Sequence, residues 1–381
     1  MNARGFTLIE LLVGGAIGVL AVTMVLGVFI SQNASFQSLD LVRQMNANAR
    51  DASLELENSL KRAGYGIDPS LAFDFSCPGQ AVGTKCHDSY NGTDDLRFYA
   101  RNPNYVYTPQ NPVLGCVTVG GCFGGGAMWS IVAATSTTIT AALGSLDVIQ
   151  KGRIVMALCS DSSHPVYGKI TANAPGPGNV FITPQIFTHT GGTADPSSLI
   201  GDSAFSCHNG GALFLVDQYH YYVTKLNNEP WLVLDTGIDY DGLNDINNLI
   251  PVARGVEEMQ VAYLYAVGTG TAPDSNHDWI VGNDATVSAV EEPDPTAARP
   301  LNGAANFSLN PGNIRGVRVS MLVRSPIPDR RLGASFLGDP ALKFENRTDV
   351  SAVTLGQYRR MPITLSLAIR NMGSANPYLF F

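Results

Sequence analysis

Three groups of residues in the sequence could do chemistry. One acid, Glu10, interrupts an apolar run over residues 8–30, and residues 235–245 concentrate Asp and Asn around two glycines. Six cysteines form the third group: Cys77, Cys86, Cys116, Cys122, Cys159 and Cys207. A carboxylate in an apolar helix favours a cationic partner, cysteines in an oxidising compartment form disulfides, and clustered carboxylates bind Ca²⁺.

The acidic segment has oxygen ligands suited to calcium, a hard cation that takes six to eight of them. Asp239, Asp241 and Asp245 are the candidate ligands. The spacing is not that of an EF-hand loop, because the twelfth position counted from Asp239 or Asp241 is apolar. A solvated acidic turn is the favoured interpretation, and no metal or other cofactor is predicted. If calcium did bind, a chelator would lower the melting temperature.

The even number of cysteines predicts disulfides, provided that the chain is exported. Fifteen pairings are possible for six cysteines. Pairing between near neighbours would give Cys77–Cys86, Cys116–Cys122 and Cys159–Cys207. A metal site is the rival interpretation, but the CxxC spacing of zinc sites is missing.

Composition and motifs exclude several functional classes. The chain has 381 residues and a formal net charge of −8, which disfavours binding of nucleic acid through bulk charge. The sequence contains no G-x-S-x-G, Walker A or H-E-x-x-H motif. We therefore expect a protein that is not an enzyme.

The apolar run is long enough to cross a membrane. Residues 8–30 carry one charge, and about 20 residues span a bilayer. Arg4 precedes the run, so the positive-inside rule places everything after residue 30 outside the cytoplasm. A cleaved signal peptide is the alternative, but the run is too long for one and is followed by no clear cleavage site.

Helical periodicity continues past the membrane segment. Apolar residues recur at steps of three and four up to Ala63, and Gly64 and Gly66 then end the pattern. Later segments alternate as strands do, and two of them flank Asn227 and Asn228 as a hairpin. The alternating apolar sets are Met259, Val261, Tyr263 and Tyr265, then Val317, Val319, Met321 and Val323, then Met361, Ile363, Leu365, Leu367 and Ile369. The pattern predicts an α+β fold, in which a long N-terminal helix packs its second half on an antiparallel sheet.

Residues 5–13, Gly-Phe-Thr-Leu-Ile-Glu-Leu-Leu-Val, resemble the class III signal of type IV pilins and type II secretion pseudopilins. The resemblance implies that a prepilin peptidase cuts after Gly5, that the new amino-terminal Phe6 is N-methylated, and that Glu10 guides assembly.

Four further blocks resemble PilW-type minor pilins, in that family's order. They are Tyr219–Val223, Ala253–Val261, Ile314–Val319 and Tyr358–Arg360. The resemblance covers residues 1–66 and 212–373, and it implies a leader at 1–5, a helix at 6–66 and an exported head at 67–381. Residues 69–210 match no pattern and are interpreted as a variable elaboration that bears the disulfides.

The resemblance implies a protein that lies in the inner membrane before assembly and in the pilus at the cell surface afterwards. It also implies that the protein primes pilus assembly and is located at the pilus tip. The implied partners are other minor pilins, the major pilin, prepilin peptidase, the inner membrane and a tip adhesin. A minor pseudopilin of type II secretion is the nearest alternative. A pilus-borne adhesive or glycan-binding module is a third interpretation, and a membrane-anchored enzyme is the least favoured.

Overall fold

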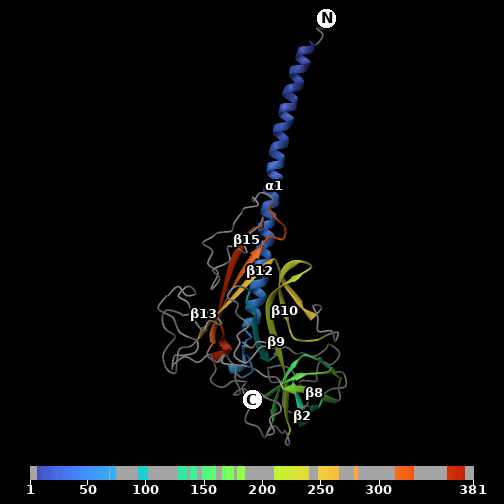
Figure 1. Ribbon diagram of the computed structural model, residues 1–381, viewed down its shortest axis with the longest axis vertical. Coiled ribbons are helices and arrows are strands. Elements are labelled where there is room, and N and C mark those ends of the chain that lie inside the picture. The colour runs from blue at the N-terminus through green and yellow to red at the C-terminus, as the bar shows by residue number, and fades with distance from the viewer. Residues whose placement is uncertain are drawn as a thin grey trace.

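The computed structural model shows a long helix with a β-rich head around its second half (Figure 1). The structure describes residues 7–67, 69–73, 93–101, 128–134, 138–143, 148–159, 165–175, 178–184, 210–239, 248–265, 279–281, 314–329 and 358–373. The α+β class predicted from the sequence is confirmed. The described strands form two large sheets, whereas the sequence pattern indicated one.

Helix α1 spans Leu8–Leu60, 53 residues, or about 80 Å at 1.5 Å per residue. Its buried residues follow steps of three and four along one stripe: Leu41, Met45, Ala49, Ala52, Leu56, Ser59 and Leu60. The helix ends before a turn in which Gly64 has a φ of 75° and Gly66 a φ of 65°, as the sequence predicted. Phe36 and Leu39, although they continue the stripe, remain exposed, so contact with the head begins one turn later than expected.

The first sheet contains four antiparallel strands in the order β13-β12-β14-β15. Their bounds are β12 Val256–Tyr265, β13 Trp279–Val281, β14 Ile314–Arg324 and β15 Arg360–Ala368. Met259, Val261 and Tyr263 of β12 are buried in the core against α1, as predicted, and so is the alternating apolar set of β14. A short 3₁₀ turn, η5 at Arg370–Gly373, follows β15 and lies near the end of α1, where Asn371 Nδ2 donates to Lys61 O at 3.0 Å.

The second sheet is organised around one long strand, β9, at Gly211–Leu226. Its second half pairs with β1 (Leu96–Arg101) on one edge and with β10 (Glu229–Asp235) on the other, and β11 (Ile250–Arg254) extends the sheet beyond β10. Asn227 and Asn228 connect β9 to β10 with φ of 51° and 64°, the conformation of a two-residue hairpin turn. The predicted hairpin is thereby confirmed.

The first half of β9 belongs to a closed antiparallel barrel. The described strands follow one another around it in the order β9-β2-β3-β8-β6-β5, and β5 pairs back with β9. Their bounds are β2 Met128–Ala134, β3 Thr138–Ala141, β5 Ile154–Cys159, β6 Val166–Ile170 and β8 Gly178–Pro184. The described structure also has a two-stranded pair, β4 (Val148–Ile149) with β7 (Ala174–Pro175), and a 3₁₀ turn, η1, at Pro69–Leu71. The barrel strands β2 and β8 lie at the end of the molecule opposite the free end of α1 (Figure 1).

Strand β5 is apolar on both faces because it forms a wall between two cores. Ile154 and Met156 point into the main core with α1, while Val155, Ala157 and Cys159 belong to the barrel core. Strand β9 also separates the two cores. Its Phe214 and Val216 lie in the main core, and its Leu213 and Leu215 lie in the barrel core. The described part of residues 69–210 therefore contributes β1 and β5 to the main core as well as forming the barrel.

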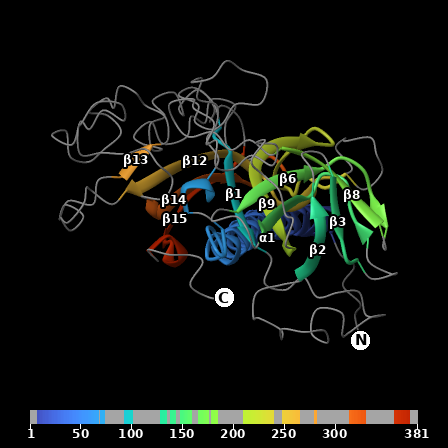
Figure 2. The same ribbon diagram turned by 90° about the horizontal axis from the view of Figure 1, so that it is seen from below.

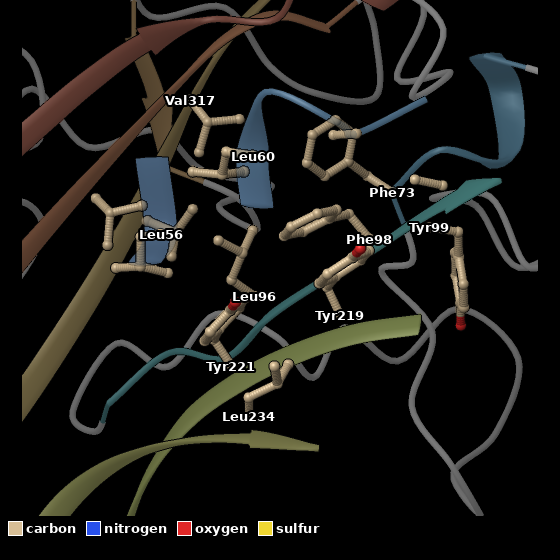
Figure 3. Packing of buried hydrophobic residues seen from close by; sticks show 14 of the residues in the cluster. Leu56, Leu60, Phe73, Leu96, Phe98, Tyr99, Tyr219, Tyr221, Leu234 and Val317 are labelled. Carbon is tan, nitrogen blue, oxygen red and sulfur yellow. The ribbon is translucent and has the colours of Figure 1, made fainter. Parts of the chain in front are cut away.

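The main core joins the helix to both sheets. Viewed along the helix, α1 lies between the sheet of β12, β14 and β15 and the sheet of β1 and β9 (Figure 2). Leu56 and Leu60 of the helix approach Val317, and aromatic side chains fill the space toward β9 (Figure 3). Phe98 stacks on Tyr219 with ring centroids 4.9 Å apart.

We expect Leu56→Ala to destabilise the head by about 2–5 kcal/mol, because Leu56 is completely buried and its removal leaves a cavity between rigid elements. Leu54→Ala is the matched control on the same helix, since Leu54 is 44% exposed, and it should cost under about 1 kcal/mol. Denaturant unfolding of the detergent-solubilised chain measures both. Equal costs would contradict the proposed packing of α1.

Candidate functional site

The first half of α1 projects beyond the head with its apolar side chains uncovered. The apolar residues from Leu8 to Ile30 are exposed, and none of this span is buried within the described structure. By length and composition α1 can cross a membrane. A soluble monomer rarely exposes so large an apolar surface, so this part of the helix needs lipid or other helices around it.

Glu10 lies on the first turn of this exposed helix. Its Oε2 accepts hydrogen bonds from Thr7 N at 3.0 Å and from Thr7 Oγ1 at 2.9 Å, and Glu10 N donates to Thr7 Oγ1 at 3.3 Å. This reciprocal capping box satisfies free donors at the helix start, where an acid is also favoured by the helix dipole. No basic group of the described residues pairs with Glu10. Gly5 and Phe6 lie outside the described residues, so cleavage and methylation stay predictions.

The other half of α1 is fixed to β9 by polar contacts. Tyr221 Oη donates to Ser59 Oγ at 2.8 Å and lies 3.2 Å from Glu55 Oε1. Just beyond the helix, Arg62 Nη1 donates to Tyr219 Oη at 3.4 Å. Burial raises the pKa of the Tyr221 phenol strongly. The helix is therefore a fixed part of the head, and its projecting half has a defined direction.

Alkaline pH tests this contact. Because the folded-state pKa of Tyr221 lies above the unfolded value of about 10, its protonated phenol should stabilise the fold fully below pH 10, and this contribution should be lost as pH rises further. The free energy of unfolding should fall by up to about 1.4 kcal/mol per pH unit per tyrosine. Tyr221→Phe should make this decline shallower, without removing it, because burial also raises the pKa of Tyr219. Unfolding measured from pH 9 to 12 compares the two proteins, and identical slopes would contradict the assignment.

The structure places part of the acidic segment against a lysine. Asp239 is buried and accepts from Lys151 Nζ at 2.6 Å, and Asp235 Oδ1 accepts from Gly237 N at 2.7 Å. Among the described residues no group of three or more His, Cys, Asp or Glu side chains is arranged so that it could hold a metal ion. Asp241 and Asp245 lie outside the described residues. The contacts of Asp239 favour a structural role for its carboxylate.

We accordingly expect a calcium chelator to leave the melting temperature of the detergent-solubilised chain unchanged at neutral pH. Lys151→Met should lower it, because the buried Asp239 carboxylate loses its ion pair with Lys151. A lower melting temperature with chelator that added Ca²⁺ restores would contradict this expectation and support the calcium site.

Cys159 is the only cysteine among the described residues. It ends β5, is buried in the barrel core and takes part in a disulfide bond. Cys77, Cys86, Cys116, Cys122 and Cys207 lie outside the described residues. Their pairing, and that of Cys159, stays a prediction.

A histidine cluster that sequence reasoning missed joins three strands. His220 on β9 approaches Asp95 next to β1, with Nε2 2.5 Å from Oδ2, and Asp235 on β10, with Nδ1 3.7 Å from Oδ2. Arg97 Nη2 lies 3.3 Å from His220 Nδ1. Burial tends to raise the pKa of Asp235, but the His220 contact and the Gly237 N–H lower it overall. Only the pairing of β1 and β10 with β9 brings these distant residues together.

Comparisons with known proteins find a similarity in structure but none in sequence. No protein-family model matches the chain, and no curated protein matches it in sequence. A solved structure of a type IV-like pilin from Thermus thermophilus is similar over 59% of this chain and 87% of that chain, at 15% identity and a TM-score of 0.20.

Proposed function

We propose that this protein is a minor pilin of the PilW type, which primes the assembly of a type IV pilus with other minor pilins and the major pilin. The observation that carries the proposal is the exposed half of α1, which is apolar from Leu8 to Ile30 and bears its one acid on the first turn. Such a helix suits lipid before assembly and a bundle of sister helices afterwards. The signal-like residues 5–13 and the four PilW-like blocks support the same class.

In this proposal the two halves of α1 have separate tasks. The exposed half packs among the helices of neighbouring subunits, while the buried half fixes the head to it through Leu56, Leu60 and the Tyr221–Ser59 contact. Prepilin peptidase acts at Gly5 in the inner membrane, and the head projects away from the cytoplasm. Partner pilins, and a tip adhesin, would then contact the surface of the head.

The mature amino terminus tests the proposal. Protein extracted from membranes should begin at Phe6 and carry one added methyl group, as measured by mass spectrometry of the amino-terminal peptide. Gly5→Glu should abolish this cleavage and leave the head folded, because the described start of α1 at Leu8 lies outside the head. A mature protein beginning at Met1 or after residue 30 would contradict the proposal.

The alternative, a minor pseudopilin of type II secretion, shares the same amino-terminal signal. Recovery of the protein in sheared surface fibres, identified by mass spectrometry after crosslinking, would favour the pilus. Recovery only with the secretion apparatus would favour the pseudopilin.

A further inference from the structure

A cleft lined by both polar and apolar side chains lies where the barrel joins the open part of the β9 sheet. On one edge of β9 the pairing with β5 ends at Val216, and the pairing with β10 starts at His220. Among the described strands none pairs with that edge of residues 217–219. The segment after β10 passes over this gap, and the resulting cleft has a volume of about 220 Å³.

The cleft brings together hydrogen-bonding groups with unused capacity. Among the described residues Asp217 accepts a single hydrogen bond, a long one from Arg153 Nη1 at 3.3 Å. The Thr236 hydroxyl is buried and has no partner within the described structure. A carboxylate and a hydroxyl that are largely removed from water but make so few hydrogen bonds are the groups with which a polar ligand would gain most.

The walls of the cleft are held in place. The Tyr219 ring stacks on Phe98, and its hydroxyl accepts from Arg62. On the other side Gly152 and Gly237 approach so closely that a Cβ on Gly152 would lie 2.0 Å from Gly237 O. Asp239 N also donates to Lys151 O at 3.1 Å. A preformed cleft with fixed walls binds a ligand at a low cost in conformational entropy.

Size and charge restrict the ligand. The volume is below the roughly 300–1,000 Å³ of sites for drug-sized ligands, so one ring of moderate size fits. Asp217 would repel an anion, and Arg153 with nearby Arg62 would repel a cation. A neutral ligand with several hydroxyls can bond to Asp217 and Thr236 without breaking the Asp217–Arg153 pair, and its C–H faces can pack on Val216 and Ile238.

We propose that this cleft binds one pyranose ring of a glycan, with Asp217 accepting from ring hydroxyls and Thr236 exchanging a further hydrogen bond. The site gives the head a recognition function of its own. Such binding is independent of whether the helix assembles into a pilus.

The test is a titration of the detergent-solubilised full chain with methyl glycosides of glucose, galactose, mannose and N-acetylglucosamine, followed by saturation-transfer NMR. At least one glycoside should bind saturably, in the range of about 1 mM. Asp217→Asn should weaken that binding at least about tenfold, because it removes the charge and one of the two acceptor oxygens, and Thr236→Val should weaken it about fivefold, because it removes the hydroxyl. Both replacements keep the size of the side chain.

Thr224→Val is the matched control, because Thr224 lies on β9 outside the cleft. It should leave the affinity unchanged. The melting temperature of each variant is measured alongside, and Thr236→Val decides the test if Asp217→Asn fails to fold. Absence of saturable binding to all four glycosides, equal losses in all three variants, or preferential binding of a zwitterion such as alanine would each overturn the proposal.

Discussion

Replacing Glu10 with valine is expected to leave the protein processed and in the membrane, but to reduce its recovery in sheared fibres at least about tenfold. This expectation depends on the proposed assembly. Within the helix bundle an unpaired carboxylate is unfavourable, and a cationic partner stabilises it. Cleavage after Gly5 would create such a cation, the methylated amine of Phe6. The Phe6 amine of a neighbouring subunit could meet Glu10 and fix the register between the two helices.

Two further variants separate this role from helix capping. In the described structure Glu10 accepts from the backbone and hydroxyl of Thr7. Thr7→Val removes the hydroxyl contact and keeps the acid, so it should still enter fibres. Glu10→Gln keeps an acceptor for the cap and removes the charge, so it should fail as the valine variant does. If Thr7→Val fails and Glu10→Gln enters fibres, Glu10 acts through capping alone.

Glu257→Ala is expected to destabilise the head by about 3–5 kcal/mol, because it removes a carboxylate that two largely buried guanidinium groups share. Glu257 on β12 accepts from Arg324 on β14 at 3.0 Å and from Arg360 on β15 at 2.6 Å. The three side chains are only 12%, 16% and 8% exposed, respectively. One carboxylate therefore ties together three strands of the first sheet. Denaturant unfolding of the solubilised chain measures the loss.

Glu229→Ala is the matched control on the other sheet. Glu229 also pairs with an arginine, Arg254, but both side chains are more than a third exposed. Water screens such a pair, and its removal should cost under about 1 kcal/mol. Equal losses for the two variants would show that burial does not decide the strength of these pairs.

Local patterns in the sequence predicted much of the fold. The helix, the Asn227–Asn228 hairpin and the strands around residues 259, 319 and 365 all appeared as periodic apolar residues or turn residues. Each of these signals arises from residues close together in the chain. The exposed site was predictable for the same reason, since residues 8–30 are apolar on every side of the helix.

The barrel could not be predicted, because its strands are short and their partners are distant. Thr138 pairs with Phe181, and Val155 pairs with Leu215. Strand β5 also lacks the alternation of a surface strand, since both of its faces are buried. The cleft was missed too, because Arg153, Asp217 and Thr236 meet only through this topology and none belongs to a recognisable motif.

The position of β9 in the chain has a consequence for how the molecule is made. Strands β1, β2 and β5 are all synthesised before β9, yet each depends on β9 for a paired edge. Until residues 211–226 emerge, these strands have unpaired edges and uncovered apolar faces, which favour aggregation. Once β9 arrives, it completes the barrel and joins it to the helix in a single step. A chain truncated between residues 185 and 210 should therefore need chaperones once it leaves the ribosome, whereas a released chain truncated after residue 254 contains the strands that pair with β9 on both edges.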